Sequence, residues 1–223
     1  MKRTVFLKCL GAVVSAVTAV FLGGCVVPSL HPLYTDADLV TEPAIVGTWA
    51  TKGGEETFKF FRKPGAKAYT MIYTWKENGV PARFDARLTR IGQGLYMDTI
   101  PQSMDEPPKS SPFSNILFAC HFPPTHVLWR LEMKDGGLQL AVLDPDLLMK
   151  ALEQKTVSVA HERLEGNEGQ ELTLVLTAST PALREFLLQS ADKVFDPDPG
   201  TLRRKLPAGK ASSPTAGKES GSQ

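Results

Sequence analysis

The feature of this chain that most restricts its fold is a strict alternation of apolar and polar residues. Phe84, Ala86 and Leu88 alternate with charged and hydroxyl side chains, and every second residue between Val127 and Met133 is large and apolar. A period of two residues places the two sets of side chains on opposite faces of a β-strand. The pattern predicts nine strands, in residues 45–49, 58–60, 69–76, 84–89, 95–100, 127–134, 138–143, 156–164 and 171–177.

The connections between these strands indicate how they pair. Most are short and rich in glycine, as in Asn78-Gly79 and Asp135-Gly136-Gly137, and such sequences favour tight hairpin turns. Consecutive strands joined in this way form an antiparallel meander, and closing the meander on itself removes its two exposed edges. We therefore predict a mainly β fold, an antiparallel up-and-down barrel. The longer, apolar connection over residues 101–124 is expected to cover one mouth of the barrel.

Two segments carry the signals of helices and not of strands. Asp144 precedes Pro145, which suits an N-cap followed by a first helical residue, and this helix is expected to run to about Gln154. A second helix is expected to begin at Thr180. Its apolar stripe, at three- and four-residue spacing, comprises Leu183, Phe186, Leu187, Ala191 and Val194.

The N-terminal sequence is typical of a secretory signal peptide. Lys2 and Arg3 precede an apolar run over residues 5–22, which ends in the small-residue sequence Leu22-Gly23-Gly24-Cys25. This tetrapeptide resembles the lipobox of bacterial lipoproteins. The resemblance implies that residues 1–24 are a type II signal peptide, that Cys25 becomes the acylated N-terminus, and that a covalent lipid on this cysteine anchors the protein to a membrane. An uncleaved spanning helix is the alternative, because the run approaches the roughly 20 residues that cross a bilayer.

The same resemblance carries expectations about location. Residue 26 is valine and not aspartate, which by the sorting habit of diderm lipoproteins implies the outer membrane, facing the periplasm. After cleavage Cys120 is the only remaining thiol, so no intramolecular disulfide is expected. Acidic side chains outnumber basic ones between residues 26 and 200, which argues against a nucleic-acid partner.

Composition divides the mature chain into three parts. Residues 25–43 are expected to form the lipidated N-terminus and a proline-rich spacer, which packs Leu33 and Tyr34 on the body and makes one helical turn near residues 36–40. Residues 44–196 are expected to form the barrel domain with its two helices. Residues 197–223 are expected to be a disordered basic tail, because their composition buries little apolar surface.

A second resemblance rests on Gly47-Thr48-Trp49. An early Gly-x-Trp, a following meander and a late helix look like the lipocalin and fatty-acid-binding superfamily, in which the tryptophan plugs one end of the barrel. The expected last strand lacks the arginine that usually stacks on that tryptophan, and Arg163, one strand earlier, is the candidate to replace it. Several blocks also look like a group of uncharacterised bacterial lipoproteins, among them Leu30-His31-Pro32-Leu33-Tyr34 and Ala160-His161-Glu162-Arg163.

Catalytic and metal sites have little support in the sequence. The pair Asp144 and Asp146 is explained by helix capping, and Cys120-His121 lies among apolar residues that favour a buried, inert thiol. His121, His126 and His161 do not have the spacing of a metal site. We therefore predict no catalytic residues, no metal and no cofactor other than the lipid on Cys25.

Three function classes follow from these expectations. The first is a non-enzymatic interaction or scaffold module of the cell envelope, whose partner would be an envelope protein. The second is a lipocalin-like carrier of a small apolar or amphipathic ligand, and the third, less favoured, is an unrecognised hydrolase. For a carrier, four aromatic side chains are candidates to line the ligand site, although aromatic residues on one strand face also suit a plain core: Trp49, Tyr69, Tyr73 and Trp75.

Overall fold

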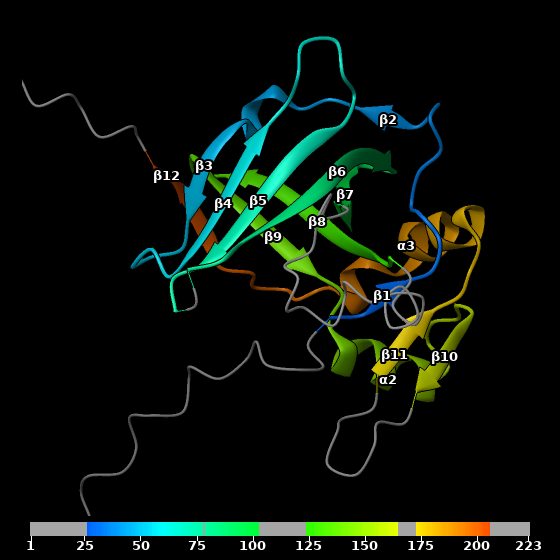
Figure 1. The fold of residues 1–223 in the computed structure, drawn as a ribbon. Coiled ribbons are helices and arrows are strands. Elements are labelled where there is room, and N and C mark those ends of the chain that lie inside the picture. The colour runs from blue at the N-terminus through cyan, green and yellow to red at the C-terminus, as the bar shows by residue number, and fades with distance from the viewer. Residues whose placement is uncertain (1–25, 78, 103–123, 165–172, 206–223) are drawn as a thin grey trace, which may run out of the picture.

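A closed antiparallel β-barrel dominates the computed structural model, which describes residues 26–77, 79–102, 124–164 and 173–205 (Figure 1). Within these residues eight strands form the barrel, and seven of them are neighbours in chain order. The eighth strand, β12, pairs with both β3 and β9 and closes the ring. The barrel strands are β3 (Gly47–Ala50), β4 (Glu56–Phe61), β5 (Tyr69–Trp75), β6 (Pro81–Ile91), β7 (Gly94–Pro101), β8 (His126–Lys134), β9 (Gly137–Val142) and β12 (Thr201–Arg204).

The predicted fold class, a mainly β lipocalin-like barrel with two helices, is confirmed. Each barrel strand from β3 to β9 overlaps a segment that alternation had marked. The inward residues of these strands pack into one cluster inside the barrel, which includes Phe58, Phe60, Met71, Leu88 and Met97. The alternation of apolar and polar residues therefore predicts which side chains face the barrel interior.

The closing strand corrects the expectation of a disordered tail over residues 197–223. Residues 201–204 form β12, and Leu202 contributes a buried side chain to the barrel interior. The amide of Lys205 then donates to the carbonyl oxygen of Thr48. Without this strand β3 and β9 would both be open edges, so the ordered domain extends to residue 205. The remainder of the tail, residues 206–223, lies outside the described residues.

Arg204 supplies the arginine that the expected last strand lacks. Its guanidinium lies 4.3 Å from the ring centroid of Trp49, which is fully buried. The indole nitrogen of Trp49 donates to the carbonyl oxygen of Ile45 at 2.7 Å. The expectation for Arg163 is wrong, because that side chain lies on β10 beside Glu153. Trp49 and Arg204 together plug the end of the barrel where β12 ends, which we call the Arg204 end.

The two helices and two further strands form a second layer against one side of the barrel (Figure 1). Helix α2 (Pro145–Glu153) and helix α3 (Thr180–Val194) match the predicted helices, and the Asp144 side chain caps α2 by accepting from the amide of Leu147 at 2.9 Å. Strands β10 (His161–Leu164) and β11 (Thr173–Leu176) pair with each other and not within the barrel. The prediction that residues 156–164 and 171–177 form strands of the barrel is therefore wrong, because alternation identifies a strand but does not show which strand it pairs with.

Residues 26–43 are part of the folded body and not a spacer. Strand β1 (Pro28–Ser29) joins β11 to β8, and β2 (Leu39–Val40) pairs with β6. The expected helical turn near residues 36–40 is therefore replaced by a turn and the strand β2, followed by the 3-10 helix η1 (Pro43–Ile45). Val27 and Leu33 are buried, and Tyr34 is half-buried against Arg87, so Leu33 and Tyr34 pack on the body as expected.

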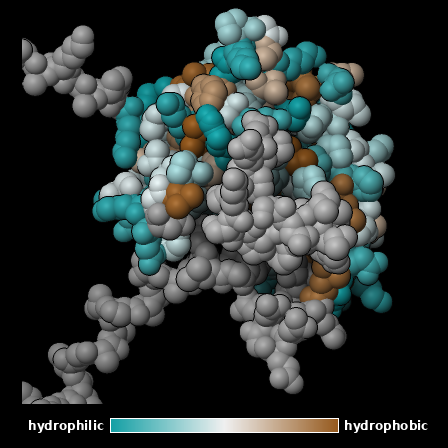
Figure 2. Space-filling model, viewed as in Figure 1, coloured by the Kyte–Doolittle hydropathy of each residue, from teal (hydrophilic) through white to brown (hydrophobic). Residues whose placement is uncertain are grey.

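Two apolar cores share one wall of the barrel. Met97 and Leu131, on β7 and β8, belong to the barrel cluster, whereas Tyr96 and Leu128, on the same two strands, belong to the cluster beneath the helices. Strands buried on both faces in this way tie the second layer firmly to the barrel. On the face shown in Figure 2, apolar residues form small, separate patches among hydrophilic ones.

Candidate functional site

The four aromatic residues proposed to line a ligand site lie at different depths in the barrel. Trp49 and Tyr69 have exposed fractions of 0% and 1%, and both are packed near the Arg204 end. The hydroxyl of Tyr69 accepts a hydrogen bond from the amide of Glu42. Tyr73 and Trp75, further along β5, are half-buried. Of the four, Tyr73 and Trp75 are the two that a ligand could contact without unpacking the plug.

Burial decreases along the inward faces of other strands in the same direction. On β6, Ala86 and Leu88 are buried and Phe84 is half-buried, and on β8 Leu131 is buried and Trp129 is half-buried. The half-buried side chains of β5, β6 and Trp129 thus lie toward the end of the barrel where β5 ends and β6 begins, which we call the Trp75 end, whereas Met133, two residues beyond Leu131 on β8, is exposed at the opposite end. Strand β7 also ends there and β8 begins there. The connecting segment, in which a cover for the mouth was expected, lies outside the described residues.

Three rings meet inside the barrel toward this end. The ring of Phe58 lies 5.0 Å from that of Tyr73 and 6.3 Å from that of Trp129, measured between centroids. Phe58 is on β4 and Trp129 is on β8, and β5, β6 and β7 separate these strands along the barrel wall. The contact must therefore cross the barrel interior, and we call Phe58, Tyr73 and Trp129 the aromatic bridge.

Each polar atom of the aromatic bridge has a partner. The hydroxyl of Tyr73 donates to Oε1 of Glu56 at 2.9 Å, and the indole nitrogen of Trp129 donates to Oγ1 of Thr99 at 2.8 Å. Burial raises the pKa of Tyr73, and the hydrogen bond to Glu56 raises it further. The phenol therefore stays neutral at physiological pH. The aromatic bridge offers a ligand ring faces with polar edges and no charged nucleophile or base.

Trp129 was not among the residues proposed from the sequence. The alternation over residues 127–134 had placed it on one strand face with Leu131, and that signal is enough to predict an inward side chain. What the alternation could not indicate is that this face meets Phe58 across the barrel. Such a contact depends on the curvature of the closed sheet.

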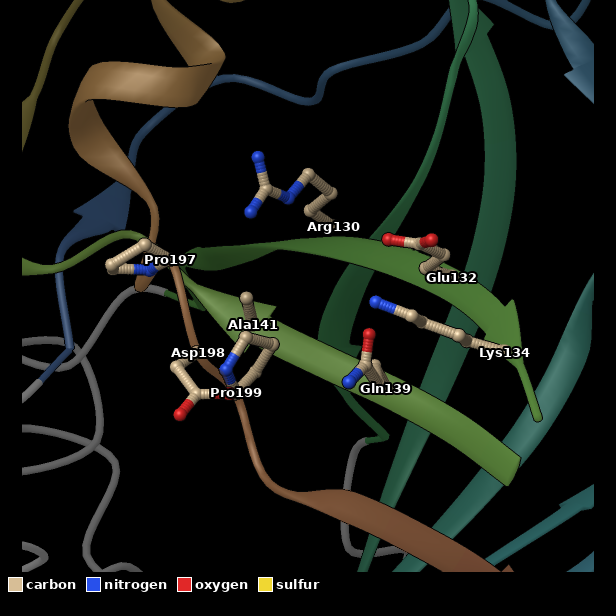
Figure 3. Close-up of a pocket in the computed structure, with 8 residues that line it drawn as sticks. All are labelled: Arg130, Glu132, Lys134, Gln139, Ala141, Pro197, Asp198 and Pro199. Carbon is tan, nitrogen blue, oxygen red and sulfur yellow. The ribbon is translucent and has the colours of Figure 1, made fainter.

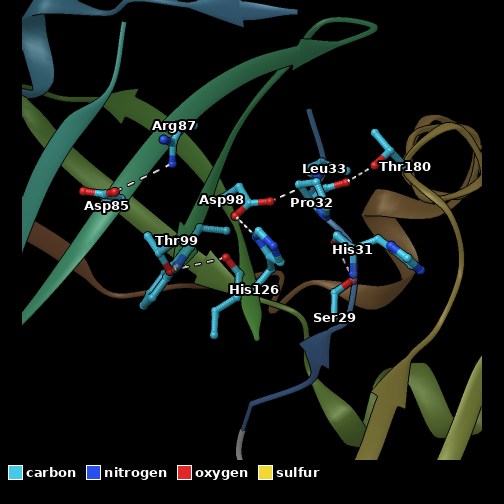
Figure 4. A network of polar contacts seen from close by, with 12 residues as sticks. Ser29, His31, Pro32, Leu33, Asp85, Arg87, Asp98, Thr99, His126 and Thr180 are labelled. Carbon is cyan, nitrogen blue, oxygen red and sulfur yellow. Dashed lines mark hydrogen bonds and ion pairs between the residues drawn. The ribbon is translucent and has the colours of Figure 1, made fainter. Parts of the chain in front are cut away.

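A cluster of polar side chains, which the sequence analysis did not predict, lies outside the barrel between β7, β8 and the N-terminal segment (Figure 4). Nδ1 of His126 lies 2.6 Å from Oδ1 of Asp98, and both side chains are buried. Oδ2 of Asp98 accepts from the amide of Leu33 at 2.7 Å. Thr180 donates to the carbonyl oxygen of Pro32, so the same segment is also bound to α3. The group holds the N-terminal segment to the fold.

The Asp98–His126 pair has a serine beside it. Ser29 lies directly opposite His126 in the β1–β8 ladder, so serine, histidine and aspartate occupy three neighbouring strands. The hydroxyl of Ser29, however, is fully buried and donates to the carbonyl oxygen of His31 at 2.8 Å. This hydroxyl is used to hold a turn and is not presented to a substrate.

Of the histidines considered for a metal site, the two in the described part of the chain, His126 and His161, have separate partners. His126 contacts Asp98, whereas Nδ1 of His161 lies 2.8 Å from the carbonyl oxygen of Val159. His121 and Cys120 lie outside the described residues. Within the part of the chain that the structure describes, no group of three or more histidine, cysteine, aspartate or glutamate side chains is arranged to hold a metal ion.

A surface hollow lies outside the barrel at the end of α3 (Figure 3). Its volume is about 100 Å³, which is below the roughly 300–1,000 Å³ of sites for small molecules. Arg130 at its edge is 3.1 Å from Oδ1 of Asp192 and lies over the ring of Phe195. Arg130 thereby fastens the end of α3 to the barrel, and the hollow is better explained by this contact than by ligand binding.

Comparisons with known proteins do not assign this chain to a family. No protein-family model, curated protein or solved structure matches the chain. Neither α2 nor α3, the α-helices of the described residues, has the length and apolar composition needed to cross a bilayer.

Proposed function

We propose that this protein is a lipid-anchored envelope protein whose barrel binds a small apolar or amphipathic molecule at the Trp75 end. The observation that carries the proposal is the aromatic bridge, of which Tyr73 and Trp129 are half-buried toward one end of a barrel whose other end is plugged by Trp49 and Arg204. The proposed role is binding without chemistry. The anchor is the acylated Cys25, and in a diderm cell the protein would face the periplasm from the outer membrane.

The lipobox sequence before Cys25 supports the anchor. One acyl chain holds a protein only marginally, whereas two or three give stable attachment, since each buried methylene contributes about 0.8 kcal/mol. A thioether-linked diacylglyceryl group with an amine-linked chain meets that requirement.

The chemistry of the aromatic bridge supports the ligand class. Tyr73 and Trp129 present ring faces, and their polar atoms are satisfied by Glu56 and Thr99. A ligand with an apolar body would gain by covering these rings, because aromatic contacts contribute about 0.5–1.5 kcal/mol beyond the area they bury. A polar head on the ligand could meet Glu56, which is half-buried beside Tyr73.

A second candidate, an interaction module for another envelope protein, is favoured by the packing deeper in the barrel. Phe60, Met71, Leu88 and Met97 are each less than 2% exposed, which indicates a filled interior toward the Arg204 end. A barrel filled along its whole length would present only outer surfaces to partners. Ligand binding at the Trp75 end distinguishes the two candidates.

The binding test uses the full mature chain with Cys25→Ser and titrates N-phenyl-1-naphthylamine, an uncharged, apolar fluorescent probe. We expect saturable binding that Trp129→Ala weakens about tenfold, the change that about 1.4 kcal/mol produces. Tyr34→Ala is the matched control, because Tyr34 is also half-buried but lies outside the barrel against Arg87. Equal effects of the two substitutions, or no saturable binding, would count against the ligand site and favour the interaction module.

The anchor has a separate test in the full-length precursor. We expect the purified protein to have the mass of a chain that begins at Cys25 and carries diacylglyceryl and acyl groups, and to fractionate with membranes. Cys25→Ser should abolish both the lipid mass and the membrane association. A precursor that keeps residues 1–24 and stays with membranes after this substitution would instead be held by an uncleaved spanning segment.

A further inference from the structure

An acidic side chain lies at the Trp75 end of the barrel, on the face that carries the aromatic bridge. Glu56 begins β4, and alternation along this strand places it on the same face as Phe58 and Phe60, which belong to the cluster inside the barrel. Glu56 is half-buried there. Among the described strands, no other inward position at the Trp75 end has a charged side chain.

Hydrogen bonds fix the position of this carboxylate. The amide of Glu56 donates to Oγ1 of Thr51 at 3.0 Å, and its carbonyl oxygen accepts from the amide of Thr51 at 3.2 Å. The hydroxyl of Tyr73 donates to Oε1 of Glu56 at 2.9 Å. Trp75 is directly opposite Glu56 in the β4–β5 ladder, and such pairs share one face of the sheet. Glu56 therefore shares its face of the sheet with the aromatic side chains of Tyr73 and Trp75.

Glu56 differs from the other carboxylates that are buried or half-buried in the described part of the chain. Each of the others contacts a cation or a backbone amide: Asp38, Glu42, Asp85, Asp98 and Asp144. Among the described residues, the carboxylate of Glu56 is bound only by the hydroxyl of Tyr73. Lys52 and Lys76, at the same end, are exposed and form no ion pair with it. Glu56 has thus lost part of its hydration without gaining an opposite charge, which is unfavourable.

The chemistry around Glu56 favours an organic cation. An ionised carboxylate only accepts hydrogen bonds, so a positively charged N–H donor is its strongest partner. The rings of Tyr73 and Trp75 act in the same direction, because the face of an aromatic ring attracts a cation within about 6 Å of its centroid. A metal ion would need several oxygen ligands, and the described residues hold no group of three or more acidic, histidine or cysteine side chains arranged for one. An ammonium group therefore fits Glu56 better than a metal ion.

We propose that the ligand of the Trp75 end is an amphiphile with an ammonium head, which pairs with the carboxylate of Glu56 while its apolar body covers the aromatic bridge. This inference rests on the proposed binding function and adds the charge of the ligand. A neutral head would leave the carboxylate without an opposite charge, and an anionic head would be repelled. The expected order of affinity is therefore cationic, then neutral, then anionic.

The test uses the full mature chain with Cys25→Ser and measures displacement of N-phenyl-1-naphthylamine at neutral pH, below the concentrations at which micelles form. The competitors share one alkyl chain and differ in the head: decylamine, decyltrimethylammonium, decanol and decanoate. We expect the two cations to displace the probe at about one tenth of the concentration that decanol requires, and decanoate to be the weakest. A stronger effect of decylamine would assign a head that donates to the carboxylate, and a stronger effect of decyltrimethylammonium a head held mainly by the rings.

Two substitutions test the role of Glu56. Glu56→Gln keeps an acceptor for the hydroxyl of Tyr73 and removes the charge, so the advantage of the cations over decanol should fall below about twofold. Glu55→Gln is the matched control, because Glu55 is the neighbouring carboxylate but is exposed. This control should keep the advantage of about tenfold, since an exposed carboxylate contributes little to binding.

The outcomes separate this inference from the proposed function. If N-phenyl-1-naphthylamine does not bind, there is no ligand site and both proposals fail. If the probe binds and decanol displaces it as well as the cations do, the ligand site stands and the ammonium head is overturned. This comparison needs no substitution at the site, so it decides the matter even if Glu56→Gln does not fold. A preference for cations that Glu56→Gln leaves intact, or that Glu55→Gln removes equally, would overturn the assignment to Glu56.

Discussion

Removing the side chain of Arg204 tests whether the last described strand is essential to the barrel. In Arg204→Ala the guanidinium that covers Trp49 is lost, together with two hydrogen bonds of 2.7 Å to the carbonyl oxygens of Val46 and Ala44. These contacts join β12 to the segment that leads into β3. The substitution therefore acts where the two ends of the barrel sequence meet.

The size of the loss follows from these contacts. A cation over an aromatic ring contributes about 0.5–1 kcal/mol at an exposed site and about 2 kcal/mol when desolvated. Arg204 is exposed although Trp49 is buried, so we take about 1 kcal/mol. The two hydrogen bonds add about 0.5–1 kcal/mol each, because water can replace the guanidinium at Val46 and Ala44. Together these terms predict a loss of about 2–3 kcal/mol.

Urea unfolding of the full mature chain, followed by circular dichroism, measures the loss directly. For a chain of this length a loss of 2–3 kcal/mol also lowers Tm by about 5–10 °C. Arg203→Ala is the matched control, since Arg203 is the neighbouring exposed arginine and donates one hydrogen bond to the carbonyl oxygen of Asp135. If Arg204→Ala and Arg203→Ala unfold within about 0.5 kcal/mol of each other, the proposed closure by Arg204 is wrong.

Three further predictions concern single positions. Gly47→Ala should destabilise the protein, because Gly47 has φ of 139° and a Cβ there would collide with Nη1 of Arg204. When Arg204 is also replaced by alanine, the loss in the free energy of unfolding caused by Gly47→Ala, measured in urea, should be smaller. Asp144→Ala should cost about 1 kcal/mol in the same assay, because the amide of Leu147 loses its cap. The folded-state pKa of Tyr73 lies above the usual 10, so the contribution of this phenol to the free energy of unfolding is complete below pH 10 and is lost as the pH rises above it. The fall in the urea midpoint between pH 9 and pH 11 should therefore be smaller in Tyr73→Phe than in the unsubstituted protein.

Alternation predicted the barrel because a half-buried strand displays its burial in the sequence. Phe58 and Phe60, or Ala86 and Leu88, had to face the interior in any strand of this register. The strand β12 carries no such signal, since its four residues include one apolar side chain, Leu202, beside two arginines. Averaged with the polar residues that follow, this segment had the composition of a disordered tail. Only its two partners, β3 and β9, explain why it is ordered.

The polar contacts were less predictable than the strands. Asp98 and His126 are 28 residues apart and meet because β7 and β8 are neighbours. The aromatic bridge depends in the same way on the closure of the sheet, which brings Trp129 to Phe58. Burial of single residues could thus be inferred from local pattern. The pairs that make up the candidate site required the topology.

Asp98 shows how a buried polar group can determine the position of the N-terminal segment. Its two carboxylate oxygens bind His126 and the amide of Leu33, and Asp98→Ala would leave both groups buried without this partner. A buried polar group left without a partner costs about 1–3 kcal/mol, so the two groups together predict a loss of about 2–6 kcal/mol. Asp85→Ala is the control, because that carboxylate is 41% exposed and its loss should cost less than about 1 kcal/mol. Hydrogen exchange at the amide of Leu33 should accelerate in Asp98→Ala beyond the change at Lys59, an amide of the β4 ladder. Equal acceleration at both amides would mean that Asp98 supports the whole fold and does not specifically hold the N-terminal segment.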